Sequence, residues 1–104
     1  MGEHELKTWP EPFQQVWLGN KTHEIRKADR LFAVGDVLHL REWKPRGGVD
    51  RMFSPGDIAA DHPGEYTGRF IRAEITYLSM GGTWGLPDGL CVMSIRPINK
   101  GEEP

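Results

Sequence analysis

Alternating apolar and polar residues form several short runs in this chain, separated by glycine and proline. In the longest run, over residues 68–79, Ile71, Ala73, Ile75 and Tyr77 form an apolar row between mostly polar neighbours. A period of two predicts a strand with one buried face. Four other extended segments are expected, over residues 4–9, 21–27, 37–43 and 90–98.

A short helix is predicted between residues 9 and 19. Phe13, Val16 and Trp17 are spaced as neighbours on one helical face. Proline is tolerated in a first helical turn, and Gly19 is typical of the residue that follows a last turn. So short a helix depends on packing rather than on its own propensity.

Two of the predicted strands place charge on a defined face. In residues 37–43, Glu42 follows two leucines on the side expected to face the core. In residues 21–27, Glu24 and Arg26 share one face with Thr22. A carboxylate beside a guanidinium is unusual on a core strand, so this face is either solvated or lines a pocket.

Glycine and proline recur through residues 44–68 too often for a regular element, which predicts a long loop. A second glycine-rich loop, over residues 81–89, carries Trp84. We expect one domain over residues 1–98, followed by a polar, poorly ordered tail over 99–104.

Composition favours a β-rich fold. The 104 residues include 13 glycines and 8 prolines, which a bundle of long helices does not tolerate. A hydrophobic fraction of 38% supports a packed core. The predicted class is α+β, mainly β: a small β-barrel of about five strands with one or two short helices.

The charge excludes a protein that coats nucleic acid through bulk positive charge, because the formal net charge is −2. The distribution is uneven. Residues 20–51 hold eight basic and five acidic residues, a balance of +3 that leaves −5 for the rest. This pattern favours a local basic site over a basic coating surface.

Cys91 is the only cysteine, so no disulfide forms within the chain. It lies in an apolar run, which predicts a buried, unreactive thiol. With no secretory signal and no apolar stretch of membrane-spanning length, we expect a cytoplasmic protein without membrane contact. The four histidines show no metal-site spacing, so neither a metal nor another cofactor is expected.

The residues Gly19, Lys21, Glu24 and Arg26 resemble the G-x-K-x-x-E-x-R motif of ASCH domains, a branch of the PUA-like superfamily. The flanking segments resemble an uncharacterised phage and bacterial ASCH-like subfamily over nearly the whole chain, and the likeness thins over residues 44–65. The resemblance implies a small β-barrel with a cleft between the helix and the motif strand. PUA-like domains typically bind RNA or modified nucleobases there.

The expected partner is therefore RNA or a modified nucleoside or nucleotide. Lys21 and Arg26 would contact a phosphate or a base edge, and Glu24 would accept a hydrogen bond from an exocyclic amine. An aromatic side chain would stack on an unpaired base. The candidate binding residues are Lys21, Glu24, Arg26, Lys27, Glu42, Trp43 and Trp84, with Tyr66 as a further stacking candidate.

An alternative implied by the resemblance is an amidohydrolase acting on N4-acetylcytidine-type nucleosides. Some ASCH proteins use a motif lysine, a motif threonine and a later glutamate for this reaction. Lys21 matches the lysine and Glu74 best matches the glutamate, whereas Glu24 stands at the threonine position. The candidate catalytic residues are then Lys21, Glu24 and Glu74. Two carboxylates near Lys21 favour its charged form, which works against its use as a base.

A further alternative assigns no ligand to the motif. Lys21, Glu24 and Arg26 would form an internal ion-pair network, and the protein would bind a protein partner through the 44–68 loop.

Overall fold

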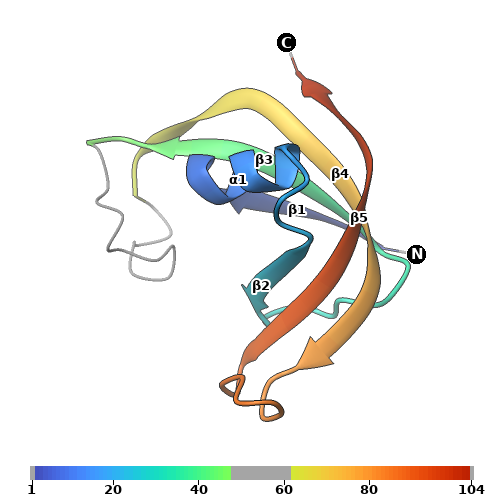
Figure 1. Cartoon of the computed structure of the whole chain (residues 1–104). Coiled ribbons are helices and arrows are strands. Elements are labelled where there is room, and N and C mark those ends of the chain that lie inside the picture. Colours follow the sequence, from blue (N-terminus) through green and yellow to red (C-terminus); the bar gives the residue numbers. More distant parts are fainter. Residues whose placement is uncertain (1, 48–61, 104) are drawn as a thin grey trace.

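The computed structural model describes residues 2–47 and 62–103 of the chain. These residues form a mainly β fold with one short helix (Figure 1). The elements are β1 (Glu3–Thr8), α1 (Pro10–Trp17), β2 (His23–Lys27), β3 (Val37–Pro45), β4 (Gly64–Met80) and β5 (Leu90–Glu102).

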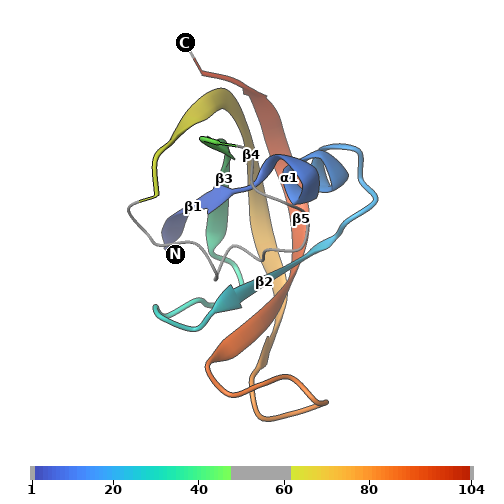
Figure 2. The same ribbon diagram turned by 90° about the vertical axis from the view of Figure 1, so that its left-hand side faces the viewer.

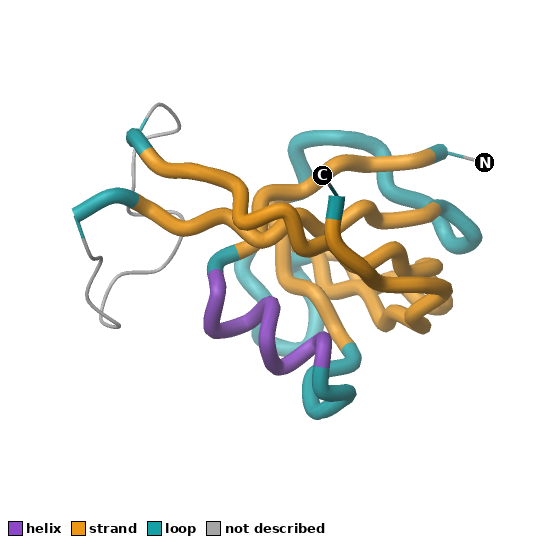
Figure 3. Tube along the Cα trace, turned by 90° about the horizontal axis from the view of Figure 1, so that it is seen from above, coloured by secondary structure: helices purple, strands orange, loops and turns teal. Residues whose placement is uncertain are grey.

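The strands form one strongly curved sheet in the order β1-β3-β4-β5-β2. β1 and β3 run parallel, and the other neighbours are antiparallel. Figures 1 and 2 show β4 and β5 bending around α1, so that the sheet is a half-barrel with the helix on its concave side. The tube view in Figure 3 shows α1 against this side of the sheet. The curvature brings β1 and β2, the two edges of the sheet, toward one another.

The core lies between α1 and the concave side of the sheet. Period-two alternation holds in β3 and in the middle of β4, as predicted, because each of these strands has one face on the core. Cys91 is fully buried, and burial raises the pKa of its thiol. The largest fully buried side chains, each less than 2% exposed, are Phe13, Leu38, Leu40, Ile71, Ile75, Cys91 and Met93.

The predicted helix is confirmed, with Pro10 at its start and Gly19 just beyond its end at a φ of +83°. A second short helix does not occur in the described residues. Residues 28–36 instead form a loop that ends in a turn at Asp36. The Asp36 carboxylate accepts hydrogen bonds from the backbone N–H groups of Gly2 and Ala33, and His4 Nε2 lies 2.8 Å from Asp36 Oδ2. These bonds tie the start of β1 to the turn.

The predicted 44–68 loop is wrong at both ends. β3 continues to Pro45, and β4 begins at Gly64, which pairs with it. A Cβ on Gly64 would lie 2.2 Å from Trp43 Cζ2, so this glycine allows two strands to pack closely rather than marking a loop. Residues 48–61 lie outside the described part.

The predicted tail is also wrong for residues 99–102, because β5 continues to Glu102 and pairs with Arg69–Arg72 of β4. The long β4 supplies the hydrogen-bonding partner that a polar segment needs to stay extended. Tyr77, expected in the buried row, is 63% exposed. The pairing of β4 with β5 shifts register between Ile75 and Tyr77, and this irregularity turns Tyr77 outward.

No helix in the described ranges is long and apolar enough to cross a membrane.

Candidate functional site

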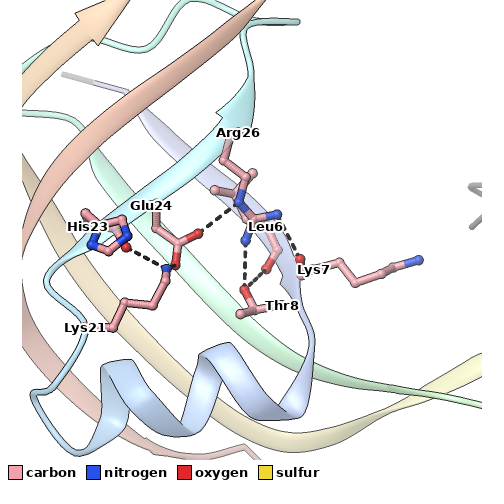
Figure 4. Close-up of polar contacts among 7 residues, drawn as sticks. All are labelled: Leu6, Lys7, Thr8, Lys21, His23, Glu24 and Arg26. Carbon is pink, nitrogen blue, oxygen red and sulfur yellow. Dashed lines mark hydrogen bonds and ion pairs between the residues drawn. The ribbon is translucent and has the colours of Figure 1, made fainter. Parts of the chain in front are cut away.

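Glu24 is a buried carboxylate on β2, only 3% exposed. Its two oxygens have different partners, as Figure 4 shows. Lys21 Nζ donates to Oε1 at 3.0 Å, and Arg26 Nε donates to Oε2 at 3.0 Å. Lys21 Nζ also donates to the His23 carbonyl at 2.6 Å. The structure turns the polar face that carries Glu24 and Arg26 toward the inside of the half-barrel.

Arg26 joins the two edges of the sheet. Its Nη1 donates to the Lys7 carbonyl and its Nη2 to Thr8 Oγ1, each at 3.0 Å. Lys7 and Thr8 belong to β1, whereas Arg26 belongs to β2, and these strands stand at opposite ends of the sheet order. The Arg26 side chain therefore bridges the line along which these two edge strands approach one another, which we call the seam. We call Thr8, Lys21, Glu24 and Arg26 the seam cluster.

Thr8 was not among the predicted site residues. It is 3% exposed and lies two residues after buried Leu6, on the same face of β1. The one feature of the sequence that could have indicated Thr8 as a site residue is a hydroxyl at a position of β1 that faces inward. Its partner was not visible in the sequence, because Arg26 lies 18 residues further along the chain.

The seam cluster carries a net charge of +1 and retains hydrogen-bonding capacity. A carboxylate can accept about four hydrogen bonds and an ammonium can donate three. Among the described residues, Glu24 accepts two hydrogen bonds and Lys21 donates two. The side chains of Lys21 and Arg26 are each 22% exposed, so solvent reaches both cations while Glu24 stays buried.

A second buried carboxylate, Glu42, lies next to the seam cluster, because Glu42 is the register partner of Thr8 in the β1–β3 pair. Arg69 donates to both oxygens of Glu42 at 3.0 Å, and Thr67 Oγ1 donates to Oε1 at 2.7 Å. Arg69 Nη2 also donates to Gln14 of α1. Burial alone would raise the pKa of Glu42, but the hydrogen bonds from Arg69 and Thr67 and the positive charge of Arg69 outweigh it and lower that pKa.

Residues 3–95 match a family described as a domain of unknown function, DUF3850. The chain belongs to this family. It is also similar to an "Uncharacterized 12.9 kDa protein in GpA 3'region" of Escherichia phage P2, with 32% identity over 81 residues. The alignment covers 78% of this chain and 58% of the phage protein, so the chain spans little more than half of that relative.

The other predicted site residues of this DUF3850 domain lie apart from the seam cluster. Glu74 alternates with buried Ala73 on β4, so it points to the outer face, where it pairs with Arg96. The grouping of Lys21, Glu24 and Glu74 is therefore not formed. Trp43 is only 5% exposed, with the Lys7 ammonium 4.3 Å from its ring centroid.

Three further candidates are on the outside of the domain. Lys27 is exposed on the face of β2 opposite Glu24. Tyr66 is 42% exposed, and the Arg41 guanidinium covers its ring at 3.7 Å from the centroid. Trp84 is 94% exposed in the loop between β4 and β5. Among the described residues, no group of three or more histidine, cysteine, aspartate or glutamate side chains could hold a metal ion.

Acid should destabilise this DUF3850 domain through Asp36 and Glu42. The pKa of Asp36 is lowered by its hydrogen bonds, first to His4 and then to the Gly2 N–H, and the pKa of Glu42 is lowered as described above. A carboxyl with a depressed pKa in the folded state contributes stability that is present above its unfolded pKa of about 4 and lost as pH falls through the folded value. Urea unfolding from neutral pH to about pH 3 should show falling stability, and Asp36→Asn should make that fall shallower. Equal slopes for the two proteins would contradict the assignment to Asp36.

Proposed function

We propose that this DUF3850 domain binds single-stranded RNA or a nucleotide and holds a base or phosphate at the seam cluster. The observation that supports this most is a buried carboxylate paired with two cations that solvent still reaches. A net positive, partly open cluster suits an anionic ligand that carries polar edges. The likeness of Gly19, Lys21, Glu24 and Arg26 to the ASCH motif supports the same partner class.

Each member of the cluster has a role in this proposal. Lys21 has a third N–H to donate to a phosphate oxygen or a base carbonyl. Glu24 is buried, so its part is to hold the Lys21 ammonium in place through their ion pair rather than to contact the ligand itself. Arg26 is committed to Glu24, Lys7 and Thr8, so its part is to position Glu24 and to supply charge at the seam.

Amide hydrolysis has less support from the geometry. The reaction needs an activated nucleophile and a proton donor to the leaving amine close to one another. Glu74, the expected proton shuttle, lies on the outer face of β4. The protein-binding alternative relies on the 44–68 loop, most of which lies outside the described residues.

Lys21→Met tests the seam cluster directly. We expect weaker binding of a fluorescein-labelled single-stranded RNA, because one cation and one donor are removed while the length of the side chain is kept. If Lys21 contacts a phosphate, the slope of log affinity against log salt should fall by about 1. Fluorescence anisotropy at several salt concentrations measures both quantities.

Lys44→Met is the matched control, since it removes the same charge from an exposed position on β3. Equal losses in the two variants would mean that binding follows overall charge and would argue against a local site. Consumption of N4-acetylcytidine by the unsubstituted protein, abolished in Lys21→Met, would support hydrolysis instead.

A further inference from the structure

Exposed apolar side chains lie on the outer face of β2, β5 and β4. They are at the end of the sheet where the loop over residues 81–89 connects β4 to β5. In the register of the sheet, Ile25 lies beside Val92, and Val92 beside Ser79. The next row along the strands ends at Tyr77. Ile25 is 52% exposed and Tyr77 63% exposed, on the face opposite Glu24. This surface is not part of the seam cluster.

Trp84 extends this surface from the loop. It is 94% exposed and has a φ of +54°, a conformation that bulky side chains rarely adopt. The loop is held by its own backbone, because the Gly82 N–H donates to the Leu86 carbonyl and the Leu86 N–H to the Thr83 carbonyl. Exposure and an unfavourable backbone conformation both disfavour tryptophan here on grounds of stability, so a role in binding explains it better.

A pocket of about 330 Å³ lies beside the Trp84 indole. This volume is near the lower limit for small-molecule sites and suits one planar ring rather than a large ligand. The Ser79 hydroxyl offers a polar contact to the edge of such a ring, whereas the Thr83 hydroxyl donates to the Met80 carbonyl. The lining residues are Ser79 and Val92 from the strands and Thr83, Trp84, Gly85, Leu86 and Pro87 from the loop.

Positive charge borders the pocket. Lys27 pairs in register with Leu90, one step along the same outer face from Val92, which places it diagonally across from the pocket. Lys27 forms no ion pair within the part of the chain that is described. The loop also holds an acid, Asp88, but its Oδ1 lies 2.8 Å from where a Cβ of Gly82 would be, so the carboxylate is folded against the loop backbone.

We call this surface the hairpin platform; it consists of Trp84, the adjoining pocket, Tyr77 and Lys27. We propose that the hairpin platform binds unpaired bases of a single-stranded nucleic acid. One base stacks on the Trp84 indole at the pocket, and Lys27 contacts the backbone phosphate. Exposed aromatic rings next to a cation are the usual means of holding single strands without sequence preference. The proposal takes its partner class from the proposed function, but it uses different residues on the opposite face of the sheet.

Trp84→Asn tests the platform, because it removes the ring and asparagine tolerates a positive φ. The probe is a fluorescein-labelled oligouridylate of about ten nucleotides, measured by anisotropy. We expect an affinity loss of about tenfold, since stacking of one base contributes about 1–3 kcal/mol. Trp84→Phe should recover most of the affinity. Binding should quench the tryptophan fluorescence of the unsubstituted protein more than that of Trp84→Asn.

Leu18→Asn is the matched control, because Leu18 is also an exposed apolar residue, 59% exposed, but follows α1 away from the platform. Unchanged affinity in Trp84→Asn together with a loss in Lys21→Met would overturn the platform and leave the seam cluster standing. The opposite result would overturn the seam cluster alone. If Trp84→Asn leaves RNA affinity unchanged but converts a dimer to a monomer in size-exclusion chromatography, a second copy of the chain covers the platform and the proposal is wrong. An unsubstituted protein that binds no oligouridylate would overturn both.

Discussion

Glu42→Ala should lower the free energy of unfolding by about 3 kcal/mol, because it removes one partner of a buried ion pair. Glu42 is 6% exposed, and Arg69 and Thr67 together donate three hydrogen bonds to it. The substitution leaves the Arg69 guanidinium, 5.0 Å from the centroid of the Phe13 ring, without its anion. Removing one partner of a buried ion pair typically costs about 3–5 kcal/mol of stability. We expect the lower end of this range, because the Arg69 side chain is 24% exposed and water can partly solvate its charge.

Urea unfolding monitored by circular dichroism measures this loss. Glu5→Ala is the matched control, because it also removes the carboxylate of a glutamate–arginine pair, here with Arg41, but the Glu5 side chain is 59% exposed. An exposed pair contributes at most about 1 kcal/mol. Adding Arg69→Met to Glu42→Ala should restore part of the stability, because no unpaired charge then remains. Similar losses in Glu42→Ala and Glu5→Ala would show that burial does not strengthen the Glu42 pair.

The spacing of apolar and polar residues and the positions of glycine and proline were sufficient to predict the helix and the five extended segments, though not all their ends. Strands such as β3 have one face on the core, so the pattern of Leu38 and Leu40 is imposed by burial and can be read from the sequence. The same reasoning placed Glu42 on the inward face, where it lies. The local sequence pattern therefore predicts structure where contact with the core alone determines whether each residue is apolar or polar.

Features that depend on a neighbouring strand could not be predicted in this way. Gly64 looked like part of a loop, and only the Trp43 ring packed against it explains it as a strand residue. Tyr77 continued the apolar row, and only the irregular pairing of β4 with β5 turns it outward. In both cases the decisive contact comes from a residue distant in sequence.

The candidate site was partly predicted for the same reason. The close spacing of Lys21, Glu24 and Arg26 along the chain indicated a local cluster, and the structure joins these three residues. Thr8 entered the cluster only because the sheet curls until β1 faces β2. Glu74 was assigned by resemblance, and its position on the outer face follows from the alternation of its own strand.

Glu24→Ala tests whether Glu24 is buried and paired, but it does not separate a cluster that only holds the fold together from one that also binds a ligand. The substitution leaves Lys21 and Arg26 as two like charges without their anion, so both interpretations predict a loss of about 3 kcal/mol in the free energy of unfolding. For a domain of this size, that loss corresponds to a fall in Tm of roughly 10 °C or more. A Tm within about 2 °C of the unsubstituted protein would contradict the burial and pairing of Glu24.

The decisive comparison is the double variant Lys21→Met with Glu24→Gln. The glutamine carbonyl can still accept from Arg26 Nε, and the methionine fills the space of the Lys21 stem, so we expect stability within about 1 kcal/mol of the unsubstituted protein. The cluster keeps its net charge of +1 through Arg26, but it loses the free Lys21 donor and the carboxylate that holds Lys21 in place. If the seam cluster binds RNA, anisotropy should show at least about a tenfold loss of affinity in this stable variant, because hydrogen bonds to charged groups contribute about 1.5–3 kcal/mol each. Full RNA affinity in a stable double variant would restrict the seam cluster to a structural role, since the remaining charge would then be sufficient without the Lys21 contact.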